Sequence, residues 1–253
     1  MVGTDPLTSY EGVACDELAV RLGVPRCLLL ARVSSVLDVV HQLAEDGAPD
    51  GTTVLAEEQE SGRGRQGRRW HSPPGTGIWL GYLRRPGPVR ESGILALRVG
   101  MMVREALERF GVTCRLKWPN DIVVCDRKLG GVLCEAHWSG GNAVWVAVGI
   151  GLNTMSPLPP EVSLSAIALD EVESRVSRID VLETLLPKLV RLPVSHELTD
   201  AEMGAYADGD WLRGRKLSEP LGGTARGIAK DGALLVETEA GIERVVGGSV
   251  VPA

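Results

Sequence analysis

Hydrophobic side chains recur at intervals of three and four residues in two early stretches, which predicts amphipathic helices there. Residues 36–43 carry three valines and a leucine at this spacing, and Gly47 follows as a helix-ending residue. Residues 93–110 carry a second stripe of the same kind, and Gly111 comes directly after it. Both helices are expected to bury one apolar face against a core.

Two further helices are predicted in the second half of the chain. Residues 179–189 repeat the helical spacing, but Pro187 lies inside this stretch and is expected to kink or split the helix. Thr199 and Glu202 have the spacing of a capping box, in which each residue caps the backbone of the other. That pair predicts a helix that starts at residue 199 and runs toward Trp211.

Short apolar runs bounded by turn residues predict strands in the rest of the first 153 residues. Valines alternate with other residues in the last of these runs, which is typical of a strand. The predicted strands are residues 27–33, 52–59, 78–85, 121–126, 129–136 and 143–153.

The texture of the sequence divides the chain into three parts. Residues 1–27 are expected to be a short, weakly organised extension, and residues 28–212 a mixed α/β domain with a surface loop at 154–176. After residue 213, short apolar pieces alternate with turn signals such as KDG and EAG. Residues 213–253 are therefore predicted to form a small, barrel-like all-β domain.

Residues 16–25 read DELAVRLGVP and resemble the first half of a helix-turn-helix. A unit that reads DNA needs a second helix in register. Here Pro25 and a strand-like run follow instead, so the stretch is interpreted as a short leading helix.

Composition narrows the classes of function. Lys and Arg number 27 against 33 Asp and Glu, a net charge of −6, which argues against a general nucleic-acid binder. Apolar runs fall short of the about 20 residues that cross a bilayer, and the N-terminal residues lack a signal-peptide layout. Five cysteines without a CxxC pair favour reduced thiols and a cytoplasmic location.

Positive charge is concentrated in residues 62–70, GRGRQGRRW. Four arginines and no acid lie between Gly62 and His71, so this stretch is locally +4 within an acidic chain. Its glycines allow close backbone approach, and arginine forks bind phosphate or carboxylate. Residues 62–69, here named the glycine-arginine loop, are a candidate anion site; the alternative is a solvated basic loop. Trp70 is either a core anchor or a plane on which a base stacks.

Three shorter segments carry further candidate chemistry. In KWPND, Lys117 suits a phosphate, Asn120 can orient a nucleotide, and Asp121 is either a Mg²⁺ ligand or an ordinary strand-start residue. In DRKLGGVLCE, a turn presents Lys128 beside a glycine pair, where it can stabilise developing negative charge. GIGLN, which ends at Asn153, adds an amide and glycine access to a strand end.

In this order, the motifs GRGRxGR, KWPND, KxGGxLxE and GxGxN resemble those of biotin protein ligases over roughly residues 28–250. The segment RGIAKDGAL at 226–234 is similar to the C-terminal SH3-like domain of that family. The resemblance implies an α+β fold: a mixed β-sheet flanked by helices, of the class II synthetase-like biotin–lipoate ligase type, followed by a small SH3-like barrel.

The resemblance also implies a two-step reaction. ATP activates biotin to biotinyl-5′-AMP, and a lysine of the biotin carboxyl carrier protein then displaces AMP. Both small reactants are anionic, so their approach requires the cations that these motifs supply. ATP and biotin are expected as substrates, with Mg²⁺; DNA and membranes are not expected partners, and a homodimer is compatible with the family.

Motif positions imply individual roles. Lys128 and Arg65 are the expected catalytic residues. The expected biotin contacts are Ser35, Gln59, Arg63, Gly64, Arg65, Lys128 and Gly131, and the expected nucleotide contacts are Arg68, Trp70, Lys117, Asn120 and Asn153.

Two departures from the family pattern stand out. The family usually shows STN or STM after the first strand, whereas this chain reads SSVL, so Val36 replaces a threonine that would contact the ureido group of biotin. Bifunctional members carry a DNA-binding domain of about sixty residues before the catalytic core, where this chain has 27 residues. The sequence therefore resembles the monofunctional type. The alternatives are a lipoate or octanoate ligase, a biotin-sensing DNA-binding regulator and a non-catalytic binding module.

Overall fold

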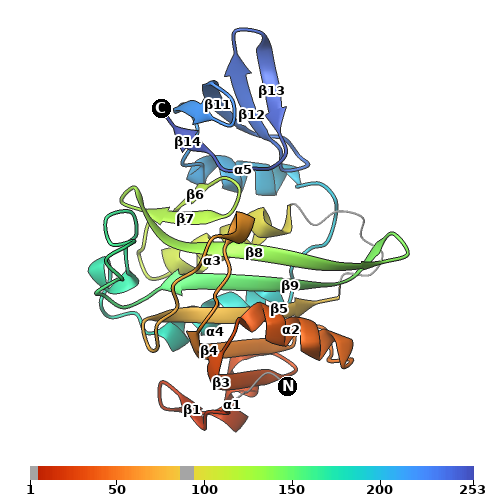
Figure 1. The fold of residues 1–253 in the computed structure, drawn as a ribbon, viewed down its shortest axis with the longest axis vertical. Helices are drawn as coiled ribbons and strands as arrows, with labels where there is room; N and C mark the ends of the chain where they lie inside the picture. Colours follow the sequence, from red (N-terminus) through yellow and green to blue (C-terminus); the bar gives the residue numbers. More distant parts are fainter. Residues whose placement is uncertain (1–4, 86–93) are drawn as a thin grey trace.

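A seven-stranded mixed sheet organises the computed structural model, which describes residues 5–85 and 94–253 (Figure 1). The strand order is β3-β4-β5-β9-β8-β7-β6; β3 and β4 are parallel and all other neighbours are antiparallel. The bounds are β3 Cys27–Val33, β4 Thr53–Gln59, β5 Gly77–Arg84, β6 Arg115–Lys117, β7 Asp121–Val124, β8 Arg127–Ser139 and β9 Asn142–Asn153.

Helices cover both faces of this sheet, as predicted. Alternate strand residues point to opposite faces, so Val54 and Ala147 pack beneath α2 (Val36–Glu45), while Leu55 and Val148 join the larger core on the other side. That larger core contains the buried side chains of α3 (Leu95–Glu108) and α4 (Arg178–Leu189). The expected mixed sheet flanked by helices is confirmed.

The N-terminal segment is better organised than its sequence indicates. Residues 5–27 include a small hairpin, β1 (Ser9–Tyr10) with β2 (Val13–Ala14), and the helix α1 (Cys15–Leu22), at the end of the molecule opposite the C-terminal strands (Figure 1). The prediction of weak organisation is wrong for these residues, because Tyr10, Leu18 and Leu22 are buried in the main core. Within residues 5–85, the element that follows α1 is strand β3 and not a second helix, so α1 is a leading helix.

Helix caps agree with the sequence, and one expected break is absent. α5 (Asp200–Gly209) begins with the predicted Thr199–Glu202 capping box. Pro187 does not split α4, which continues to Leu189. The proline lies in the last turn, so few backbone bonds depend on it, and the buried leucines before it hold the helix to the core.

The segment 154–176 is only partly the surface loop that was expected. It contains a short 3₁₀ turn, η2 (Leu169–Glu171), and its residues 166–169 are buried. The backbone of Ala166 bridges to that of Lys128 on β8. This contact holds residues 166–169 beside the sheet. The Pro- and Ser-rich start of the segment gives no sign of this burial.

The C-terminal strands form a separate five-stranded antiparallel sheet, consistent with an SH3-like domain and drawn at the top of Figure 1. The indole Nε1 of Trp118 donates to the carbonyl of Gly232 at 2.8 Å and so joins this sheet to the main domain. The boundary expected after residue 212 stays a prediction. The strands are β10 Lys216–Glu219, β11 Gly223–Ile228, β12 Leu234–Thr238, β13 Gly241–Val245 and β14 Val251–Pro252.

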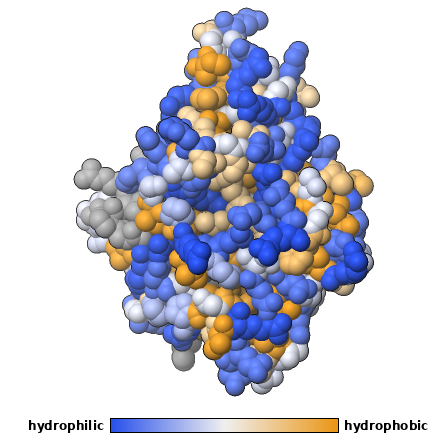
Figure 2. Space-filling model, turned by 180° about the vertical axis from the view of Figure 1, so that it is seen from behind, coloured by the Kyte–Doolittle hydropathy of each residue, from blue (hydrophilic) through white to orange (hydrophobic). Residues whose placement is uncertain are grey.

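Hydrophilic residues cover most of the face shown in Figure 2, where apolar residues form separate patches. Within residues 5–85 and 94–253, none of the helices combines the length and apolar character needed to cross a membrane.

Candidate active site

All the sequence-predicted site residues line one cavity of about 450 Å³. It lies on the α2 side of the sheet, and the glycine-arginine loop, β8, β9 and the C-terminal domain also contribute to its wall. The structure therefore brings together motifs that are up to 118 residues apart, while the individual role of each residue stays a prediction. The predicted residues in the lining are Ser35, Gln59, Arg63, Gly64, Arg65, Arg68, Trp70, Lys117, Asn120, Asp121, Lys128, Gly131 and Asn153.

Glycines on two neighbouring strands leave space for this cavity above the sheet, because they have no side chains. Gly131 on β8 pairs with Gly151 on β9, and both line the cavity. A Cβ on Gly151 would lie 2.6 Å from the indole of Trp70, and one on Gly149 would lie 3.1 Å from Leu37. Only glycine lets Trp70 lie this close to the sheet.

The end of the cavity near α2 is a buried polar corner. Ser35 caps α2 by accepting a bond from the amide of Leu37. The amide of Val36 donates to Oε1 of Gln59 at 2.9 Å, and Nε2 of Gln59 donates to Oγ of Ser72 at 2.7 Å. Val36 thus takes part through its backbone, although it lacks the hydroxyl of the family threonine.

Internal bonds shape the glycine-arginine loop as a narrow hairpin. The amide of Gly64 donates to the carbonyl of Arg68 at 2.7 Å. The amide of Trp70 donates to the carbonyl of Gly62 at 2.8 Å. Gln66 has a φ of 58° and Gly67 a φ of 72°, so two left-handed residues make the tip.

The arginines of this loop have different surroundings. The guanidinium of Arg63 pairs with Asp38 on α2 and with both carboxylate oxygens of Glu135 on β8, at 3.1 and 2.9 Å. Burial lowers the pKa of Arg65; Asp121 opposes and Arg68 adds to this effect. The Arg65 guanidinium still carries its charge near neutral pH. Because Arg63 is already paired with two carboxylates, Arg65 is better suited to bind an incoming anion.

Lys128 lies in the cavity wall. Its Nζ is 2.6 Å from Oδ1 of Asp121 and 5.1 Å from the centre of the Trp70 ring. Lys117 lies over the Trp211 ring at 5.2 Å, and burial lowers its pKa. The repulsion from neighbouring cations, Lys128 among them, adds to that shift, whereas Asp121 opposes it.

The charges of the lining favour an anionic ligand. Six lysines and arginines line the cavity against two aspartates, so a bound anion would relieve repulsion among the cations. The cations are Arg63, Arg65, Arg68, Arg69, Lys117 and Lys128, and the carboxylates are Asp121 and Asp126.

The two predicted asparagines brace the backbone around the cavity. Nδ2 of Asn120 donates to the carbonyl of Val132 at 2.8 Å, which ties the KWPND turn to β8. Nδ2 of Asn153 donates to the carbonyl of Ile167 at 3.3 Å and so holds the segment after β9. Both asparagines therefore stabilise the backbone around the cavity. Their contacts with a nucleotide stay predictions.

The carboxylates of the cavity already pair with cations. Asp121 pairs with Lys128, and Oδ1 of Asp126 accepts bonds from Arg215 at 3.0 Å and from the Trp211 indole at 2.6 Å. The described part of the chain has no cluster of three or more metal-ligating side chains. Mg²⁺ usually needs only one or two carboxylates in addition to substrate phosphates, so Asp121 is compatible with such a site.

The motifs did not identify several residues of the lining. Oγ of Ser249 accepts a bond from Arg68 at 2.7 Å and lies 2.7 Å from Oε1 of Gln66. Trp211 and Val162 also line the cavity. Ser249 lies 181 residues from Arg68 along the chain, and no local pattern marks it. Among these residues, only Trp211 has a sequence signal for a place in the site, because it is a tryptophan beside the expected domain boundary.

Comparisons with known proteins agree with this geometry. The Biotin/lipoate A/B protein ligase family matches residues 29–153, and the Biotin protein ligase C terminal domain matches residues 213–251.

Individual relatives cover nearly the whole chain. A bifunctional ligase/repressor BirA from Bacillus subtilis is 32% identical, over 86% of this chain and 71% of its own. A biotin–[acetyl-CoA-carboxylase] ligase from Paracoccus denitrificans is 31% identical, over 84% of this chain and 95% of its own. The solved biotin protein ligase from Aquifex aeolicus, in complex with biotin and ATP, aligns with a TM-score of 0.74 and 28% identity over 90% of this chain and 99% of its own. The chain therefore belongs to the biotin protein ligase family.

Proposed function

We propose that this chain activates biotin with ATP to biotinyl-5′-AMP and transfers the biotinyl group to a lysine of a biotin carboxyl carrier protein. The observation that carries this proposal is that a buried polar corner and a cationic region meet in one cavity. The corner at Ser35 and Gln59 offers hydrogen-bonding groups to a small polar head group. The region around Arg65, Lys117 and Lys128 offers charge to phosphates.

In the first step, a carboxylate oxygen of biotin forms a bond to the α-phosphorus of ATP. The bond from that phosphorus to the bridging oxygen breaks, and pyrophosphate leaves with its electron pair. The step needs no proton transfer from the protein. Lys128 and Arg65 hold the two anions together and stabilise the charge on the phosphoryl oxygens, so positioning and electrostatics supply the catalysis.

In the second step, the neutral amine of the acceptor lysine attacks the acyl carbon of biotinyl-5′-AMP. A C–N bond forms as the C–O bond to AMP breaks, and the amine proton is lost to solvent. The same cations stabilise the departing AMP. The glycine-arginine loop shields the mixed anhydride from water until the acceptor arrives.

Mg²⁺ is part of this proposal as a companion of ATP. When bound, it neutralises phosphate charge and helps to orient the leaving pyrophosphate. Asp121 is the residue proposed to contact it, beside Lys128. The other expected roles, those of Arg68, Trp70, Asn120 and Asn153 toward the nucleotide and of Arg63, Gly64 and Gly131 toward biotin, are proposed on the same basis.

The cell context is proposed as cytoplasmic. The five cysteines, Cys15, Cys27, Cys114, Cys125 and Cys134, are all free thiols, as expected in a reducing compartment. The Paracoccus relative is named for acetyl-CoA carboxylase, which supports a carboxylase carrier domain as the acceptor. A function without DNA binding is proposed from the net charge of −6, because a general nucleic-acid binder needs a basic surface. A homodimer remains part of the proposal only through the family resemblance.

The main rival is a lipoate or octanoate ligase, because the family that matches residues 29–153 includes lipoate enzymes. The match of residues 213–251 to the C-terminal domain of biotin protein ligases favours biotin. An ATP–pyrophosphate exchange assay with biotin or lipoate in parallel decides between them. Biotin-dependent exchange supports the proposal, whereas exchange with lipoate alone overturns it. A salt-titrated DNA gel shift tests the regulator alternative.

A further inference from the structure

Arg178, the first residue of α4, joins three segments of the chain and lies outside the cavity lining. Its Nη1 and Nη2 donate to the two carboxylate oxygens of Glu57 on β4, at 2.8 and 3.1 Å, and its Nε donates to Oε1 of Glu11 at 2.8 Å. The side chain is only 11% exposed, and its guanidinium lies 4.4 Å from the centre of the buried Tyr10 ring. Two carboxylates and an aromatic ring thus hold this arginine in one position.

Glu57 connects the guanidinium to a turn in the cavity wall. Its Oε2 also accepts a bond from the amide of Gly75 at 3.2 Å. Gly75 lies in the turn at residues 73–76, here named the wall turn, and Pro73 and Thr76 of this turn line the cavity. The position of the wall turn therefore depends on where the Glu57 carboxylate is held.

The wall turn directly follows the buried polar corner of the cavity. Oγ of Ser72, the residue before the turn, accepts a bond from Nε2 of Gln59 at 2.7 Å, and the amide of Gln59 donates to the carbonyl of Ser72 at 3.1 Å. Gln59 and Glu57 lie two residues apart on β4, so the same strand holds the corner and the turn. A displaced wall turn would therefore disturb the corner that is proposed for biotin.

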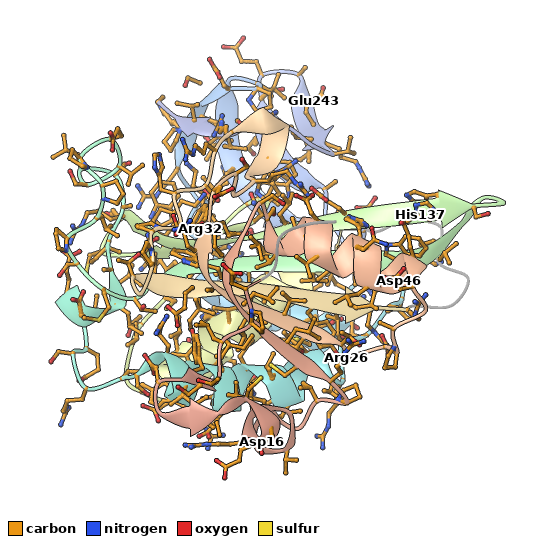
Figure 3. The ribbon with its side chains drawn as sticks, turned by 60° about the horizontal axis from the view of Figure 1, so that its bottom comes forward. Asp16, Arg26, Arg32, Asp46, His137 and Glu243 are labelled. Carbon is orange, nitrogen blue, oxygen red and sulfur yellow. The ribbon has the colours of Figure 1, made fainter. Side chains whose placement is uncertain are left out.

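The β1–β2 hairpin holds the guanidinium from the other side. Glu11 forms the turn of this hairpin, and its Oε2 accepts a bond from the amide of Ile179 in the first turn of α4 at 3.0 Å. The segment before the hairpin pairs with β3, where the amide of Leu7 donates to the carbonyl of Leu29 at 3.1 Å. Figure 3 shows α1, which follows the hairpin and carries the labelled Asp16, beside α4. Contacts on both sides of the hairpin thus fix the position of the Glu11 carboxylate.

We propose that Arg178 is a positioning residue for the biotin end of the cavity, and that the β1–β2 hairpin contributes to this positioning. Glu11 holds the guanidinium, the guanidinium holds Glu57, and Glu57 holds the wall turn; these three side chains are here named the brace. The inference rests on the proposed function, because it places biotin in the polar corner beside Gln59. The bonds of the brace are a property of the unliganded protein.

Amide hydrogen exchange of the unliganded protein tests the brace without biotin or ATP, because this exchange follows local opening. Arg178→Gln removes the fork to Glu57, and the Gly75 amide is expected to exchange its hydrogen about tenfold faster. Arg178→Lys keeps the charge but not the fork, so the increase should stay below about threefold. Arg175→Gln is the matched control, because it removes an exposed pair with Glu173 just before α4. Unchanged exchange at Gly75 in Arg178→Gln would overturn the proposal.

Initial rates of biotin-dependent ATP–pyrophosphate exchange connect the brace to the site. In Arg178→Gln, the KM for biotin is expected to rise about tenfold, while the KM for ATP changes less than about twofold and kcat less than about threefold. A loss of folded protein would instead lower the apparent kcat and leave both KM values unchanged. An unchanged KM for biotin, or an equal rise in both KM values, would contradict the positioning role.

Glu11→Gln tests the contribution of the hairpin. This substitution keeps an oxygen that can accept from the amide of Ile179, but it removes the charge that faces Arg178. The KM for biotin is expected to rise about threefold in wild type and to change less than about twofold in an Arg178→Gln background. Glu17→Gln, at an exposed position of α1, is the control. Full additivity of the two substitutions would contradict an effect of Glu11 through Arg178.

Circular dichroism checks the fold of each variant. If Arg178→Gln fails to fold, the other two brace variants decide. A raised KM for biotin in Arg178→Lys or Glu11→Gln supports the proposal, whereas wild-type values in both overturn it. If folded wild type shows no biotin-dependent pyrophosphate exchange, the proposed function fails, and hydrogen exchange at Gly75 still decides whether the brace holds the wall turn.

Discussion

Gly151 shows at the scale of one residue how the site depends on an absent side chain. Its position on the central strand β9 is held by β5 on one side and β8 on the other, so its backbone cannot retreat. The indole of Trp70 occupies the space that a Cβ would need. The motif GxGxN therefore reflects packing of a tryptophan on the sheet as much as access for a ligand.

Gly151→Ala is expected to displace Trp70, because the new Cβ would lie 2.6 Å from its ring. We expect a loss of about 1–3 kcal/mol in the free energy of unfolding and a KM for ATP raised about tenfold. Urea unfolding and initial rates measure the two effects. Gly204→Ala is the control, because open space surrounds Gly204 in α5 and alanine favours the helix. An unchanged KM in Gly151→Ala would contradict the placement of Trp70 at the nucleotide.

Lys128 is the residue on which the chemistry depends most. Lys128→Gln keeps much of the side-chain length but removes the charge, so the adenylation rate is expected to fall about 100-fold or more. Biotin-dependent pyrophosphate exchange measures it, and Lys216→Gln on the exposed surface of β10 is the control. A Lys128→Gln protein that keeps the wild-type rate would refute the catalytic role.

At the scale of elements, the glycine-arginine loop has a pH dependence that follows from Glu135. The hydrogen bond from His41 and the bonds and charge of Arg63 hold the pKa of Glu135 below its ordinary value of 4.5, against the effect of burial. A depressed pKa in the folded state contributes stability that is complete above the unfolded value and is lost as the pH falls through the folded value.

Wild type should therefore exceed Glu135→Gln in the free energy of unfolding at pH 7, and the difference should shrink below about pH 4.5. The difference at pH 7 is expected to be at most about 1 kcal/mol, because the side chains of Arg63 and Glu135 are 36% and 31% exposed. Urea titrations of both proteins from pH 3 to pH 8 measure it. A difference that grows as the pH falls would contradict the ion pair.

The same scale shows what the sequence could predict. Periodic stretches predicted α2, α3 and α4, because the packing of these helices depends on local spacing. The Thr199–Glu202 capping box predicted α5, because the cap depends on residues only three apart. The order of strands and the burial of Tyr10 in the main core depend on contacts between distant segments. The motifs identified residues that line the cavity, and their individual roles stay predictions. The pairing of Arg63 with Asp38 and Glu135 joins three segments and has no local signature.

At the scale of the whole molecule, the C-terminal domain completes the cavity. Trp118 bonds the carbonyl of Gly232, and Ser249 reaches the tip of the glycine-arginine loop. Gly248, Ser249 and Val250 lie in the cavity lining beside residues of the main domain. The small domain is therefore expected to affect the nucleotide end of the site through a few contacts.

Ser249→Ala removes the bonds to Arg68 and Gln66. We expect the KM for ATP to rise about fivefold while the KM for biotin changes less than twofold, because Ser35 and Gln59 lie at the other end of the cavity. Ser218→Ala, in the same domain but remote from the loop, is the control. Equal changes in both KM values would contradict this division of the cavity.

Mass spectrometry of the product formed by the purified protein from biotin and Mg²⁺–ATP tests the proposed function most directly. We expect biotinyl-5′-AMP with one equivalent of pyrophosphate, no adenylate when lipoate replaces biotin, and about 100-fold less product with Lys128→Gln. A folded wild-type protein that forms no biotinyl-5′-AMP, or that forms the lipoyl adenylate in its place, would contradict the assignment of this cavity to biotin and ATP.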